Sequence, residues 1–119
     1  MGRRQRQTRL RAPDTDYVDP DGNLLRLRGA LKPGARVEYA SIATGQQLAP
    51  SANREDAWQR AVEFLFERLT VRWEIAGVAV ASQRDLIRRF RASTPAERAW
   101  IRSTLRDHCA DHFPDLEAP

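Results

Sequence analysis

Hydrophobic residues recur with helical spacing in the middle of the chain, between about residues 54 and 76. At about 100° per residue, one broad face collects Trp58, Ala61, Val62, Leu65, Phe66, Leu69, Trp73 and Ala76. A narrower apolar stripe on the far side contains Ala57, Phe64, Val71 and Ile75. The pattern predicts a long central helix at about 54–76 that is apolar on two sides.

The second stripe needs a cover, because a helix on the outside of a small domain requires only one apolar face. In one interpretation, the other elements of the same chain wrap around the helix. In the alternative, Phe64, Val71 and Ile75 form an interface with a partner protein or a second copy of the chain, since exposed large apolar groups usually mark association.

A turn sequence near the start of the chain predicts a β-hairpin. Pro20, Asp21 and Gly22 separate two extended pieces, so we expect residues 17–19 to pair with 24–28. The stretch is rich in aspartate, and a calcium loop is the alternative. Counted from Asp14, however, the sixth and twelfth positions lack the Gly and Glu of an EF-hand, which favours a plain turn.

Three further helices are predicted from periodicity and capping residues. The first spans about 34–44 with Gly45 as its cap, although Val37 and Tyr39 also alternate as in a strand, and a linker follows at 46–52. The second spans 83–92 after Ser82. The third spans 95–112 and begins with Thr94, Pro95 and Glu97, the signature of a capping box with proline in the first turn.

These elements together predict a mainly α protein with a small N-terminal β-hairpin followed by about four helices. Residues 1–16 are almost devoid of apolar side chains, so they are expected to form a disordered basic arm. Residues 17–119 are expected to form a single helical domain, because their number is ordinary for one domain.

Charge is distributed unevenly, and this changes the functional picture more than the net charge of +4 does. Residues 1–11 carry +5, residues 84–106 carry +5, and residues 107–119 carry −4. Lys32 is the only lysine, so GC-rich coding could also account for the arginine content, and a plain solvated surface is the simplest explanation of the pattern.

The two basic blocks predict a non-enzymatic binding module that associates with nucleic acid. A structured patch would position phosphates while a basic arm reaches further along the backbone. The candidate arginines are Arg3, Arg4, Arg6, Arg9, Arg11, Arg84, Arg88, Arg91, Arg98 and Arg102, with Arg106 on the same helix. A helix-turn-helix is favoured less, because the expected connection of Ser93 and Thr94 is short and lacks glycine. The alternative function is a protein-interaction or assembly factor that uses the second stripe.

Candidate chemistry is sparse elsewhere. His108 and His112 lie one helical turn apart, the spacing of two zinc ligands, but Cys109 stands where a zincin needs its catalytic Glu. We therefore expect no metal or other cofactor, and instead a half-buried histidine pair near a helix end, where a pH-sensitive contact is a secondary hypothesis. No nucleophile motif, phosphate-cradling loop or small-molecule site is recognisable, so we expect no enzyme activity.

The hydrophobic segments are too short to span a membrane, and the arginine-rich start is not followed by the apolar segment of an export signal. The lone Cys109 agrees with a reducing compartment. We therefore expect a cytoplasmic protein.

Overall fold

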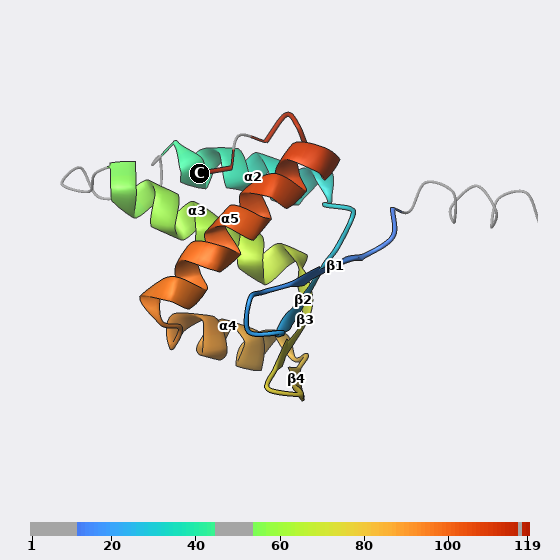
Figure 1. Ribbon diagram of the computed structural model, residues 1–119. Coiled ribbons are helices and arrows are strands. Elements are labelled where there is room, and N and C mark those ends of the chain that lie inside the picture. The colour runs from blue at the N-terminus through green and yellow to red at the C-terminus, as the bar shows by residue number, and fades with distance from the viewer. Residues whose placement is uncertain (1–11, 45–53, 117) are drawn as a thin grey trace, which may run out of the picture.

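The computed structural model describes residues 12–44, 54–116 and 118–119 (Figure 1). Its first element is the predicted hairpin, in which β1 (Thr15–Val18) pairs antiparallel with β2 (Leu24–Leu27). β1 begins at Thr15, ahead of the expected start at Tyr17. The predicted disordered arm lies outside the described residues over positions 1–11.

The Asp19 carboxylate organises the hairpin turn. Its Oδ1 accepts hydrogen bonds from the backbone N–H groups of Asp21 and Asn23, both at 2.9 Å, and Oδ2 accepts from the Asn23 side chain at 3.1 Å. Gly22 adopts φ 85°, which a residue with a side chain rarely adopts. The aspartate is thus engaged in turn formation, as the plain-turn interpretation requires.

The expectation of a mainly α protein is wrong, because the hairpin belongs to a four-stranded antiparallel sheet with the order β1-β2-β3-β4. The predicted helix at 54–76 is in fact two elements: α3 (Arg54–Leu69) ends seven residues early, and β3 (Thr70–Ile75) follows directly. A turn at Ala76 and Gly77 then leads into β4 (Val78–Val80). The fold is therefore mixed α/β.

Tertiary pairing decides the conformation of residues 70–75. Trp73 fits the broad apolar face of the predicted helix and Ile75 fits its narrower stripe, but the segment also contains β-branched and aromatic residues suited to a strand. Trp73 faces Leu25 of β2 on one side and Val80 of β4 on the other. Pairing with β2 is a long-range interaction, whereas β4 closes a local hairpin through the turn at Ala76 and Gly77. Helical periodicity reports neither kind of pairing, so the periodicity of this segment was misleading.

The remaining helices lie close to their predicted positions. They are α2 (Pro33–Ala43), α4 (Gln83–Arg91) and α5 (Pro95–His112). The strand alternative for α2 is wrong, and its proposed cap Gly45 lies outside the described residues. Ser82 caps α4 by accepting the Asp85 backbone N–H, and α5 begins with the complete predicted capping box.

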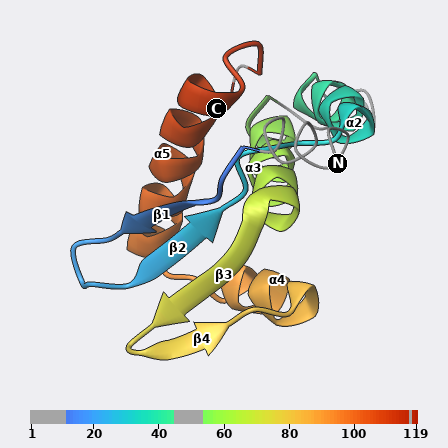
Figure 2. The same ribbon diagram turned by 90° about the vertical axis from the view of Figure 1, so that its right-hand side faces the viewer.

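Helices α3, α4 and α5 cover one face of the sheet, where the main core forms, and α2 packs on α3. Leu25, Leu27 and Trp73 of the sheet are almost fully buried, together with the apolar face of α3 and the residues Leu86, Phe90, Ile101 and Leu105 of α4 and α5. Figure 2 shows the four strands side by side, with β4 leading into α4. The other face of the sheet, which we call the open face, carries two ion pairs, Asp16–Arg26 and Glu74–Arg72.

Candidate nucleic-acid interface

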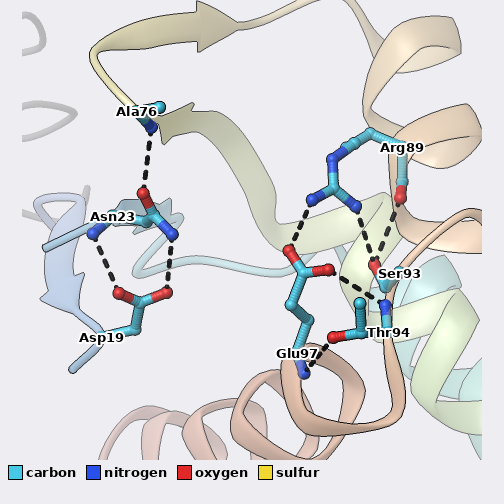
Figure 3. A network of polar contacts seen from close by, with 7 residues as sticks. All are labelled: Asp19, Asn23, Ala76, Arg89, Ser93, Thr94 and Glu97. Atoms are coloured by element: carbon cyan, nitrogen blue, oxygen red, sulfur yellow. Dashed lines mark hydrogen bonds and ion pairs between the residues drawn. The ribbon is translucent and has the colours of Figure 1, made fainter. Parts of the chain in front are cut away.

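A network of polar contacts holds the corner between α4 and α5 (Figure 3). Thr94 Oγ1 accepts the Glu97 backbone N–H at 3.1 Å, and the Glu97 carboxylate accepts the Thr94 N–H at 3.0 Å and pairs with Arg89 of α4. The backbone hydrogen bond from Thr94, with help from Arg89, lowers the pKa of Glu97 below its ordinary value. The corner therefore fixes how the side chains of the two helices are presented.

Three of the four arginines of α4 project to solvent beside α3. Arg84, Arg88 and Arg91 are exposed and line a shallow groove that also includes Glu67 of α3. Arg91 is held by Glu63 of α3, with 2.6 Å between Nη2 and Oε1. Within the described part of the chain, Arg84 and Arg88 have neither an ion-pair nor a hydrogen-bond partner.

The arginines of α5 line a second groove, between α3 and α5. Arg98 donates from Nη2 to the Arg91 carbonyl oxygen at 2.9 Å, and its guanidinium lies 5.5 Å from the centre of the Phe90 ring. These contacts tie the first turn of α5 to the last residue of α4. They also bring cations of the two helices close together.

The two other α5 arginines differ in how they are engaged. Arg102 lies 5.6 Å from the centre of a Trp58 ring and 3.7 Å from a carboxylate oxygen of Glu55, both on α3. Arg106 is exposed and has no such partner among the residues that the structure describes.

The structure thus brings the three arginines of α5 and three of the four arginines of α4 to one side of the molecule, around the polar side of α3. The fourth, Arg89, lies over the Trp73 ring instead. We call this surface the basic face, and define it by Arg60, Arg84, Arg88, Arg91, Arg98, Arg102 and Arg106. Arg60 was absent from the predicted set, because its position on α3 relates it to α5 only in three dimensions. Four carboxylates share the two grooves, namely Glu55, Asp56, Glu63 and Glu67.

The five predicted arginines of the arm, Arg3, Arg4, Arg6, Arg9 and Arg11, lie outside the described residues. The connection between α4 and α5 comprises residues 92–94, which is one residue longer than the sequence suggested. Its length falls within the usual range for a helix-turn-helix, although it still contains no glycine.

The three residues of the alternative interface do not share one exposed stripe. Phe64 is only 7% exposed and packs against Tyr39 of α2, with ring centres 6.4 Å apart. Val71 and Ile75 are half-buried and lie in β3, beyond the end of α3. The helix is therefore covered from within the chain, mainly by α2, at the position of Phe64.

Both ring nitrogens of His108 are engaged within the fold, and His112 Nε2 lies 3.5 Å from the Thr15 hydroxyl oxygen. His108 is fully buried, and its ring nitrogens contact the Tyr17 hydroxyl and the Arg28 carbonyl oxygen, both at 2.7 Å. Because a carbonyl only accepts, His108 Nε2 carries the proton and Nδ1 accepts from Tyr17. Burial lowers the pKa of His108, and the neighbouring His112 ring, 4.3 Å away between centres, lowers it further.

Within the described regions, no group of three or more His, Cys, Asp or Glu side chains has the geometry to hold a metal ion. Burial raises the pKa of Cys109 to about 11, so its reactive thiolate form is disfavoured near neutral pH. No helix in these regions combines the length and the apolar character needed to cross a bilayer.

Comparisons with known proteins add no relative: no family model, curated protein or solved structure matches this chain.

Proposed function

We propose that this protein is a non-enzymatic module that binds nucleic acid through the phosphate backbone, using the basic face. The observation that carries the proposal is the gathering of arginines from α3, α4 and α5 around two adjoining grooves. Arg84, Arg88 and Arg106 have no acidic partner among the described residues, so their charges are available to a ligand.

Preorganisation supports the same conclusion. The guanidinium groups of Arg98 and Arg102 lie over aromatic rings, and the Thr94–Glu97 capping box holds the helices that carry them. Side chains that are already ordered lose less conformational entropy on binding. Guanidinium groups are also well matched to phosphate oxygens, to which they can donate two parallel hydrogen bonds.

The predicted tail would add five positive charges that precede β1 in the sequence, and the proposal includes it as an auxiliary contact. A cytoplasmic location, where nucleic acid is accessible, is part of the proposal. Protein association through Phe64, Val71 and Ile75 is less favoured than nucleic-acid binding, because Phe64 is occupied by packing within the chain.

The test is fluorescence anisotropy with a labelled duplex of about 20 base pairs, titrated between about 50 and 200 mM salt. Binding should weaken steeply with salt because the contacts release counterions. A variant with Arg84→Gln, Arg88→Gln and Arg106→Gln removes three unpaired cations. It should bind more weakly and reduce the slope of log K against log salt by about 2 to 3.

A matched control removes the same formal charge elsewhere. The control is the triple variant Arg26→Gln, Arg72→Gln and Lys32→Gln. All three residues lie outside the basic face, and the first two lie on the open face of the sheet. This control should keep nearly the wild-type slope. No wild-type binding at about 50 mM salt, or equal losses in the two triple variants, would refute the proposal.

A further inference from the structure

Two carboxylates of α3 occupy arginines that the basic face would otherwise offer to a ligand. Glu63 Oε1 accepts from both Nε and Nη2 of Arg91, at 3.2 and 2.6 Å, and Glu55 lies 3.7 Å from Arg102. Glu55, Glu63 and Arg102 line the α3–α5 groove, and Arg91 lies at its border with the α3–α4 groove. The carboxylates therefore stand where anionic groups of a ligand would bind.

The pairs are open to exchange because they are accessible to solvent. The Arg91 side chain is 65% exposed and Glu63 is 34% exposed, while the corresponding values for Arg102 and Glu55 are 35% and 54%. Exposed ion pairs of this kind contribute little to folding stability, since water and salt screen them. A ligand anion can displace the carboxylate without unfolding the helix that carries it.

The charged residues of this groove recur at regular intervals along their helices. Glu55 and Glu63 are eight residues apart on one helix, which corresponds to about 12 Å along its axis. Arg98, Arg102 and Arg106 follow each other at four-residue intervals on α5, which is about 6 Å per step. The α3–α5 groove is thus lined by three evenly spaced arginines of α5 and by the Glu55 and Glu63 carboxylates of α3.

We propose that Glu55 and Glu63 act as internal competitors that hold Arg102 and Arg91 until several phosphates of one ligand displace them together. This inference rests on the proposed function and deepens it. When an isolated anion displaces one carboxylate, the number of ion pairs stays the same, so little binding free energy is gained. A nucleic-acid backbone with several phosphates also engages the unpaired Arg84, Arg88 and Arg106, so its additional contacts drive the exchange.

The competitors therefore select a ligand class: linear polyanions with closely spaced phosphates, in preference to single phosphate or carboxylate groups. The structural cost of this selectivity is reduced affinity, because two of the seven arginines are already neutralised. Removing the carboxylates should raise affinity and add contacts, in contrast to most substitutions at a binding surface.

The test compares wild type with the double variant Glu55→Gln and Glu63→Gln in the anisotropy assay. Two additional phosphate contacts should steepen the salt slope by about 1.8 and tighten duplex binding on the order of tenfold or more at about 0.1 M salt. Adding Arg91→Gln and Arg102→Gln to the double variant should abolish the gain. Inorganic phosphate at equal total phosphate should not compete with the duplex for wild type.

A matched control frees two arginines on another surface. Asp16→Asn and Glu74→Gln release Arg26 and Arg72 on the open face of the sheet, where the ion pairs have similar exposure and the change in net charge is the same. This control should gain much less affinity than the groove variant.

The outcomes separate the two proposals. Failure of wild type to bind the duplex at about 50 mM salt overturns the proposed function, and this inference with it. Wild-type binding with no gain in the groove variant, or with an equal gain in the sheet control, overturns the inference alone. A gain that survives loss of Arg91 and Arg102 also overturns it, since the freed arginines would then not carry the effect.

Discussion

The hydrogen bond between Tyr17 and His108 links the first strand to the last helix, and its removal has a calculable effect. The two atoms lie 2.7 Å apart, and His108 is fully buried. Tyr17→Phe leaves His108 Nδ1 as a buried acceptor without a donor. Such a loss costs about 1 to 3 kcal/mol of unfolding free energy.

The assay is chemical and thermal denaturation of wild type and Tyr17→Phe. For a domain of this size each kcal/mol lowers Tm by roughly 4 °C, so the variant should melt at a measurably lower temperature. Nitrogen chemical shifts of His108 should also place its proton on Nε2 in wild type, because Nε2 faces the Arg28 carbonyl oxygen.

A double-mutant cycle with His108→Leu isolates the pairwise contribution. If the bond is as the geometry indicates, Tyr17→Phe should cost less in the His108→Leu background, with a coupling of about 0.5 to 1.5 kcal/mol. A destabilisation below about 0.5 kcal/mol for Tyr17→Phe, together with purely additive effects in the cycle, would refute this account of the contact.

Three further predictions follow from burial and charge. Phe64→Ala should destabilise the fold by about 3 to 5 kcal/mol, because Phe64 is core against Tyr39; a folded variant that merely changes its oligomeric state in size-exclusion chromatography would contradict this. Thr70→Val should be neutral or stabilising by up to about 1 kcal/mol, since the buried Thr70 hydroxyl has no partner in the described regions; a clear loss in urea titrations would show a missed hydrogen bond. Burial lowers the pKa of His108 below its ordinary 6.5, so as pH falls through that value the unfolded chain takes up a proton before the folded chain does. The free energy of unfolding should therefore decrease there and stay lower at more acidic pH. His108→Leu should remove that part of the pH dependence, and an unchanged pH profile in this variant would argue against the assignment to His108.

Much of the candidate site could be predicted from the sequence, but which of its arginines form ion pairs could not. Capping signals at Ser82 and Thr94 placed α4 and α5 to within a residue, and helical periodicity then put the arginines on their outer sides. The pairing of Arg91 with Glu63 joins residues 28 positions apart on different helices. Whether two such residues meet depends on how the helices pack, and no local sequence pattern predicts that packing.

The amino-acid sequence by itself determined the local elements whose signals lie within a few residues: the aspartate-stabilised hairpin turn, the capped starts of α4 and α5, and the end of α5 before Pro114. Only the tertiary structure decided the fate of residues 70–75, whose apolar residues suit either a helix or a strand. Pairing with β2 and β4 converted that segment into the third strand, because backbone hydrogen bonds on both sides and burial of Trp73 outweigh its local helical pattern. The same long-range packing set α3 against α4 and α5, and so determined which arginines face carboxylates and which remain open to a ligand.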